Sequence, residues 1–161
     1  FSILGPAFVE GARVLDLYAG TGALGIEALS RGAVWVDFVE ANARRGRQLR
    51  ETLAELSLAE RARVYLMPVE RALDSLSDPY DVVFADPPYD MEAWEPLMDR
   101  LSTGNLINEA GLAVIEYRHG ASVREEYGKL VQMTRRRYGD TAISIFRSGA
   151  TRDKSDLSRQ L

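Results

Sequence analysis

Residues 13–33, RVLDLYAGTGALGIEALSRGA, decide the fold. Residues 13–18 form a short apolar run with a single acid, which predicts a buried strand. A glycine-rich turn follows, and then helix formers over residues 22–31 that stop at Gly32, a typical helix end. A strand, a glycine turn and a helix in this order predict the opening unit of an α/β fold with a parallel sheet.

The rest of the chain repeats this alternation and then departs from it. Apolar runs predict further strands at 34–39, 63–66, 80–85 and 111–117, and helices are expected after Asn42, at 70–76 and at 91–101. Two extended runs at 130–138 and 141–146 follow, joined by Gly139-Asp140, a hairpin signal. We therefore expect a Rossmann-like α/β sandwich whose mostly parallel sheet ends in a C-terminal antiparallel hairpin.

The composition is that of an ordinary globular protein, with 46% hydrophobic and 27% charged residues in a chain of 161. We expect one domain over residues 1–147 and a poorly ordered polar tail over 148–161. No apolar run is long enough to cross a bilayer, and no signal peptide opens the chain. We therefore expect a cytoplasmic protein without membrane contact, acting as a monomer.

The chain has no cysteine and one histidine, His119, which excludes disulfides and metal clusters built from thiolates or histidines. We expect no metal. The formal net charge of −4 is unfavourable for binding nucleic acid, because phosphate contacts depend on Lys and Arg, although a local basic patch can suffice. The chain begins at Phe1 instead of methionine, so we expect a further N-terminal segment that could carry a basic arm.

Residues 20–25, GTGALG, match the pattern G-x-G-x-x-G between a predicted strand and a predicted helix. Glu40 follows at the end of the next strand, 20 residues after Gly20. This spacing is the usual fingerprint of dinucleotide binding, so the loop alone also indicates an NAD-linked oxidoreductase. Glu40 would accept hydrogen bonds from the ribose hydroxyls of such a cofactor, and the glycines let the backbone approach it closely.

Asp16 distinguishes between the two cofactors that this loop could hold. It stands near the end of the first predicted strand, just before the glycine turn. A pyrophosphate docked at the following helix N-terminus would face this carboxylate in a low-dielectric crevice, which is unfavourable. S-adenosylmethionine carries an ammonium group and a sulfonium and has no phosphate. We therefore expect S-adenosylmethionine as the cofactor.

The segment Asp86-Pro87-Pro88-Tyr89 directly follows a predicted strand and so lies where ligands of open α/β folds bind. The exocyclic amine of a nucleic-acid base is a poor nucleophile, because its lone pair is delocalised into the ring. Asp86 and the Pro87 carbonyl can each accept one N–H of such an amine, and Asp86 would stabilise the positive charge that develops on nitrogen. Tyr89 can stack on the base, which must be unpaired or flipped. We predict these four residues as the catalytic residues.

Three stretches of the sequence carry a family resemblance: VLDLYAGTGALGIEALSRGA, FVEAN and DVVFADPPYD. Together they resemble the bacterial RsmD-type methyltransferases, which modify the exocyclic amine of a guanine in 16S rRNA. The resemblance implies the seven-stranded methyltransferase fold, with 16S rRNA or the small ribosomal subunit as partner. It also implies a target-base site at residues 86–89. The predicted cofactor-binding residues are Asp16, Tyr18, Gly20, Thr21, Gly22, Glu40, Ala41 and Val69.

One position departs from the pattern of that family. Such enzymes commonly carry Asp or Asn followed by Ala after the third strand, beside the adenine of the cofactor, whereas this chain has Pro68-Val69 followed by Glu70. Proline has neither a donor nor an acceptor side chain, so adenine recognition would fall to the Val69 backbone amide or to Glu70. A DNA amino-methyltransferase, an NAD-linked oxidoreductase and a module that binds the cofactor without turnover remain as alternative functions.

Several other residues have a plain structural interpretation. Glu116 and Tyr117 end the fifth predicted strand and could line the site, although an acid at a strand end is more often solvated. The arginines of 135–137 lie on one strand and therefore alternate between its faces, so they cannot all meet one run of phosphates. Trp94 is expected to pack in the interior.

Overall fold

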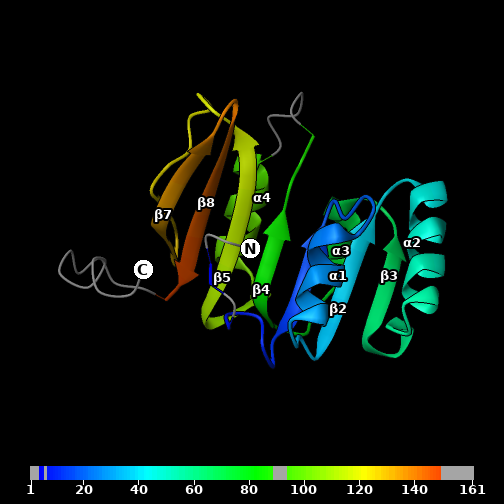
Figure 1. Ribbon diagram of the computed structural model, residues 1–161. Helices are drawn as coiled ribbons and strands as arrows, with labels where there is room; N and C mark the ends of the chain where they lie inside the picture. The colour runs from blue at the N-terminus through cyan, green and yellow to red at the C-terminus, as the bar shows by residue number, and fades with distance from the viewer. Residues whose placement is uncertain (1–3, 6, 89–93, 150–161) are drawn as a thin grey trace.

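The computed structural model describes residues 4–5, 7–88 and 94–149 of the chain. It contains one sheet with the strand order β3-β2-β1-β4-β5-β8-β7-β6, which Figure 1 shows from its α1 and α2 side. The first five strands pair in parallel, whereas β8 is antiparallel to β5, and β7 is antiparallel to β8. The strands are β1 (Arg13–Leu17), β2 (Trp35–Glu40), β3 (Ala62–Leu66), β4 (Tyr80–Ala85), β5 (Ile107–Arg118), β6 (Glu126–Tyr127), β7 (Leu130–Tyr138) and β8 (Thr141–Ser148).

The predicted fold class is confirmed, with one additional strand. The sheet of the described residues has eight strands instead of seven, because the two-residue β6 pairs with the outer strand β7. The hairpin predicted at Gly139-Asp140 joins β7 to β8, and Gly139 adopts a φ of 61°. β8 runs further than the predicted 141–146, since Ser148 pairs with Leu130 and is 2% exposed.

Helices cover both faces of the sheet, which explains the nearly continuous apolar strands. Helices α1 (Ala23–Ser30) and α2 (Ala43–Glu55) pack on one face, where Phe38 and Leu49 belong to the same apolar cluster. Helices α3 (Val69–Ser75) and α4 (Trp94–Thr103) pack on the other face, where Leu15 and Met98 share a cluster. A short 3-10 helix, η1 (Ala59–Arg61), precedes β3.

The order of the elements places the loops that follow β1, β2 and β4 at one edge of the sheet, because the carboxyl ends of parallel strands meet there. In the part of the chain that the structure describes, no helix is long and apolar enough to span a membrane. The same residues contain no group of three or more side chains suited to hold a metal ion.

Candidate active site

A cavity of about 640 Å³ opens at the carboxyl ends of β1, β2 and β4. This volume is within the usual range for small-molecule sites. Both sequence motifs contribute to its wall, so the structure brings the glycine loop and the Asp-Pro-Pro segment together. Among the residues that the structure describes, its lining consists of Tyr18, Gly20, Glu40, Ala41, Asn42, Arg45, Pro68, Val69, Glu70, Asp86, Pro87 and Pro88.

Glu40 is held by two backbone amides, one in the turn between β1 and α1 and one in the turn between β2 and α2. Its Oε1 accepts a hydrogen bond from the Gly20 amide at 3.1 Å, and its Oε2 accepts one from the Asn42 amide at 3.0 Å. The side chain is buried. Each carboxylate oxygen has a second lone pair, so Glu40 keeps the capacity to accept hydrogen bonds from a ligand in the cavity.

Glycine is required in the turn between β1 and α1 for two different reasons. Gly20 has a φ of 58°, and Gly22 has a φ of 79° where it caps α1, both in the left-handed region that favours glycine. A Cβ at Gly22 would also lie 2.3 Å from Leu49 Cδ1 of α2. The turn therefore depends on backbone freedom and on close packing against the neighbouring helix.

Asp16 lies beneath the glycine loop and is absent from the wall of the cavity. It is 2% exposed, and its Oδ2 accepts a hydrogen bond from the Gly25 amide in α1 at 3.1 Å. Burial raises the pKa of Asp16 to about 8; the Gly25 hydrogen bond opposes this shift, and the charges of Asp86 and Glu40 add to it. The predicted cofactor residues Thr21 and Gly22 are likewise not part of the wall.

The Asp-Pro-Pro segment begins where β4 ends at Ala85. Asp86 and Pro88 are exposed, whereas Pro87 is buried between them. Partial burial raises the pKa of Asp86 to about 6, and the negative charge of Glu116 adds to the shift. Tyr89, the fourth predicted catalytic residue, lies outside the described residues.

The start of α3 also lines the cavity. Pro68 precedes the helix in an extended conformation, and Val69 is its first residue. The amides of a first helical turn have no partner within the helix, so the Val69 N–H is available to a ligand by its position. Burial raises the pKa of the neighbouring Tyr18 to about 12, with the charge of Glu70 adding to the shift.

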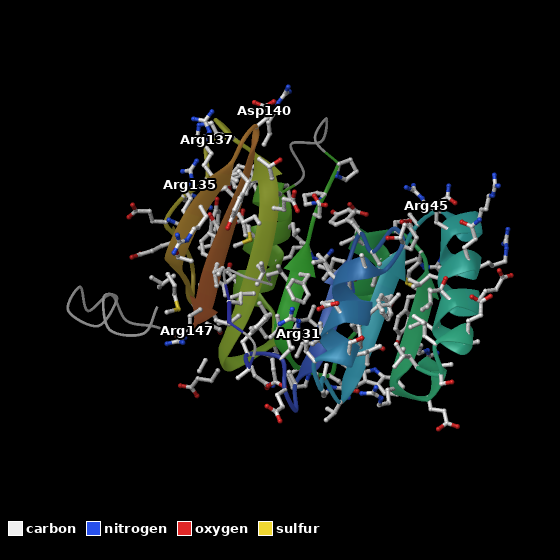
Figure 2. The ribbon with its side chains drawn as sticks, in the orientation of Figure 1. Arg31, Arg45, Arg135, Arg137, Asp140 and Arg147 are labelled. Atoms are coloured by element: carbon white, nitrogen blue, oxygen red, sulfur yellow. The ribbon has the colours of Figure 1, made fainter. Side chains whose placement is uncertain are left out.

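The charged residues of the wall are mostly acidic. Within the described part of the wall, Glu40, Glu70 and Asp86 are opposed by one basic side chain, that of Arg45. The Arg45 Nε lies 3.8 Å from Glu40 Oε1, and the arginine side chain is largely exposed. Figure 2 shows Arg45 at the N-terminal end of α2. The cavity therefore favours a ligand that carries positive charge and disfavours one that carries phosphates.

The sequence predictions missed Asn42 and Arg45 as wall residues. Asn42 was predicted only as a helix cap, which it is, because its side chain accepts a hydrogen bond from the Arg45 amide at 3.0 Å. The capping residue could have indicated both positions, because it marks the start of a helix directly after Glu40, the acid at the end of the second strand.

Tyr117 and Trp94 have structural roles. Tyr117 is 2% exposed, and its hydroxyl lies 2.6 Å from Ser144 Oγ, so it does not line the cavity. Trp94 stacks against Tyr117 with ring centroids 6.1 Å apart, which confirms the prediction that it packs in the interior.

The predicted alternation of the β7 arginines is also found. Arg135 pairs with Ser144 in the ladder, and its guanidinium lies 5.6 Å from the centre of the Tyr117 ring. Arg136 pairs with Ile143, whose side chain belongs to the apolar cluster of the opposite face. Figure 2 shows Arg135 and Arg137 projecting from the outer part of the sheet, far from Arg45.

Comparison with known proteins identifies a family whose model matches this chain. The model of a family described as "Conserved hypothetical protein 95" matches residues 1–147. A candidate rRNA methyltransferase of Bacillus subtilis, YlbH, is 34% identical over 150 residues, which cover 91% of this chain and 81% of that protein. The ribosomal RNA small subunit methyltransferase D of Escherichia coli K12 is 34% identical over 116 residues. That match covers 72% of this chain, but the chain spans only 58% of the Escherichia coli protein.

Solved structures agree with this assignment of the fold. A conserved hypothetical protein of Streptococcus pyogenes superimposes with a TM-score of 0.86 at 32% identity, covering 92% of each chain. A candidate methyltransferase of Escherichia coli, yhhF, gives a TM-score of 0.85 at 28% identity and covers 94% of this chain and 84% of its own.

Proposed function

Because the chain belongs to the family described as Conserved hypothetical protein 95, which is that of the RsmD-type proteins, we propose that it is a methyltransferase acting on small-subunit rRNA. In this proposal a methyl group passes from S-adenosylmethionine to the exocyclic amine of a guanine. The observation that carries it is the shared cavity. Asp86 and Pro87 line the same space as Gly20 and Glu40, so a cofactor and a base held by these residues would meet.

The residues of the cavity fit S-adenosylmethionine better than a dinucleotide. The wall carries three acids and one arginine, so a pyrophosphate would meet repulsion where an ammonium group is attracted. Glu40 is positioned by two backbone amides to accept the hydroxyls of a ribose. Val69 offers a backbone amide at the start of α3 for the adenine edge. These features favour the methyltransferase over the NAD-linked oxidoreductase.

Asp16 supports the cofactor from below the loop. Its carboxyl group fixes the first turn of α1 through the Gly25 amide, and its burial favours the neutral form in the ligand-free protein. A cationic group placed above the loop would favour the ionised form. In its ionised form Asp16 would thus stabilise the positive charge of the cofactor without forming part of the cavity wall.

The chemistry of transfer follows from the Asp-Pro-Pro segment. When bound, S-adenosylmethionine supplies an electrophilic methyl group. Asp86 and the Pro87 carbonyl accept the two N–H groups of the amine and turn its lone pair out of the ring plane. Asp86 also stabilises the positive charge that develops on nitrogen as the methyl leaves sulfur, and in its ionised form it can accept the departing proton.

A transfer assay tests the proposal. The enzyme, purified with any segment that precedes Phe1 in its gene, is incubated with labelled S-adenosylmethionine and undermethylated small ribosomal subunits, naked rRNA or duplex DNA. Mass analysis of the digested nucleosides identifies the product. An amino-methylated guanosine from the ribosomal samples is the expected result. Label found only in DNA would favour the DNA amino-methyltransferase, and binding without transfer would favour a cofactor-binding module.

A further inference from the structure

A second carboxylate stands beside Asp86 at the end of β5. The parallel strands β4 and β5 are in register, with Ala85 opposite Ile115, so Asp86 and Glu116 follow as neighbours at the same edge of the sheet. Figure 1 shows these two strands side by side. The charge of Glu116 contributes to the raised pKa of Asp86, which agrees with their closeness.

Alternation along β5 determines where Glu116 points. Val114 belongs to the apolar cluster under α1 and α2, whereas Ile115 belongs to the cluster under α3 and α4. Glu116 follows Ile115 and is therefore on the same face as Val114. It is half-buried, its ladder neighbour on β8 is the apolar Ile143, and it stands next to the wall residue Asp86 without being part of the cavity wall itself. The position combines partial access to solvent with proximity to the acid that is proposed to hold the reactive amine.

The base edges differ in what they place next to the amine. On the Watson–Crick edge of guanine the ring atom beside the 2-amino group is N1, which carries a hydrogen and donates. In adenine and cytosine the ring nitrogen beside the amine carries no hydrogen and accepts. An ionised carboxylate accepts hydrogen bonds and cannot donate one, so a second carboxylate next to the amine site favours guanine and repels the other two bases.

We propose that Glu116 is a specificity-determining residue that accepts the N1–H of the target guanine while Asp86 accepts an N–H of its amine. The inference rests on the proposed function, because it concerns the base that this site receives. Glu116 would recognise the Watson–Crick edge of the base, next to the Asp-Pro-Pro segment that holds its amine. A flipped or unpaired base presents that edge to the pocket.

A base analogue combined with variants of residue 116 tests this contact. 2-Aminopurine keeps the 2-amino group of guanine but lacks both the N1 hydrogen and O6, so only the part of the preference that depends on residue 116 reports on the N1–H contact. Ligated small-subunit rRNA would carry guanine or 2-aminopurine at the nucleotide that the transfer assay identifies. The preference for guanine over 2-aminopurine, measured as a ratio of kcat/KM, would be compared between the wild-type enzyme and Glu116→Ala.

The wild-type enzyme is expected to prefer guanine roughly 10- to 100-fold, the value of one hydrogen bond to a charged group, and Glu116→Ala to keep a preference below about 3-fold. Glu116→Gln retains an acceptor oxygen and should fall between them, which keeps the test decisive if the alanine variant folds poorly. Glu109→Ala, an exposed position near the other end of the same strand, is the matched control and should behave as wild type.

The outcomes separate the two proposals. If the variants lose activity on both bases equally, Glu116 acts only through the charge of Asp86 or through structure, and the inference is overturned while the function stands. If the wild-type enzyme methylates no guanine in the unmodified rRNA, the proposed function fails and the inference fails with it.

Discussion

Glu40 and Asp86 line the same cavity, but the protein holds them in opposite ways. Both carboxylate oxygens of Glu40 accept hydrogen bonds from backbone amides, and the residue is only 6% exposed. Asp86 is exposed, and among the described residues no donor forms a hydrogen bond with its carboxylate. The cofactor end of the cavity is therefore organised before any ligand arrives, whereas the base end keeps its acceptor for the substrate. The contrast fits the roles proposed for the two acids, Glu40 in orienting the cofactor and Asp86 in the chemistry of transfer.

The largest expected effect comes from removing the acid that serves chemistry. Asp86→Ala should lower the rate of methyl transfer by on the order of 10²–10³-fold, because one preorganised electrostatic contact to the transition state is lost. Its dissociation constant for S-adenosylmethionine should stay within about 2-fold of wild type if the two ends act separately. Single-turnover transfer and calorimetric binding measure the two quantities. Asp140→Ala, on the distant hairpin, is the control, and equal losses of rate and affinity would break the comparison.

The second effect concerns the acid that serves orientation. Glu40→Ala should weaken S-adenosylmethionine binding by roughly 10- to 100-fold, because two backbone amides and the ribose hydroxyls lose a charged acceptor. Glu40→Gln keeps one acceptor oxygen and should lose less. Isothermal titration measures the affinity, with Glu51→Ala on the exposed side of α2 as the control. An unchanged affinity in Glu40→Ala would show that the cofactor binds elsewhere.

A third effect uses the pH dependence of Asp16. Its pKa is raised from 3.8 to about 8 in the folded protein, so the folded state binds this proton more tightly than the unfolded state does. Its contribution to stability is therefore largest below pH 4 and is lost as the pH rises to about 8. The Tm of ligand-free wild type minus that of Asp16→Asn should decrease from pH 5 to pH 8. A difference that is constant across this range would contradict the burial of an ionisable Asp16.

The smallest effect should come from Arg45. Its guanidinium is 3.8 Å from Glu40 and is exposed, and exposed ion pairs of this kind contribute little. Arg45→Ala should change the affinity for S-adenosylmethionine by less than about 3-fold, whereas Glu40→Ala changes it far more. Titration at low and high salt checks this. A large loss would mean that the arginine, and not the backbone, holds Glu40 in place.

The sequence was sufficient for the residues that a parallel sheet places at one edge. Gly20, Glu40 and Asp86 each follow a recognisable strand, and the carboxyl ends of β1, β2 and β4 must meet whatever the details of packing. The fold class followed from the same alternation. Element ends were less predictable, since β5 begins at Ile107, four residues before the predicted start.

Two features required the register of the strands. Asp16 was predicted as a cofactor-binding residue; the structure places it under α1, where its carboxyl group accepts a hydrogen bond from the Gly25 amide, outside the cavity wall, and its role toward the cofactor stays a proposal. The closeness of Glu116 to Asp86 depends on how β4 and β5 are aligned, and the sequence does not specify this alignment. A further element, β6, was not predicted because a strand of two residues is too short to show any periodicity in the sequence.

The position of β8 has a consequence for biosynthesis. This strand follows all the others along the chain, yet it pairs between β5 and β7. While the protein is being translated, the strands on the cofactor side can assemble as they leave the ribosome, but β5 keeps an open edge until residues 141–148 emerge. The nascent chain would therefore cover the edge of β5 only after the cofactor side has assembled, and a chaperone that shields strand edges would be most useful in that interval.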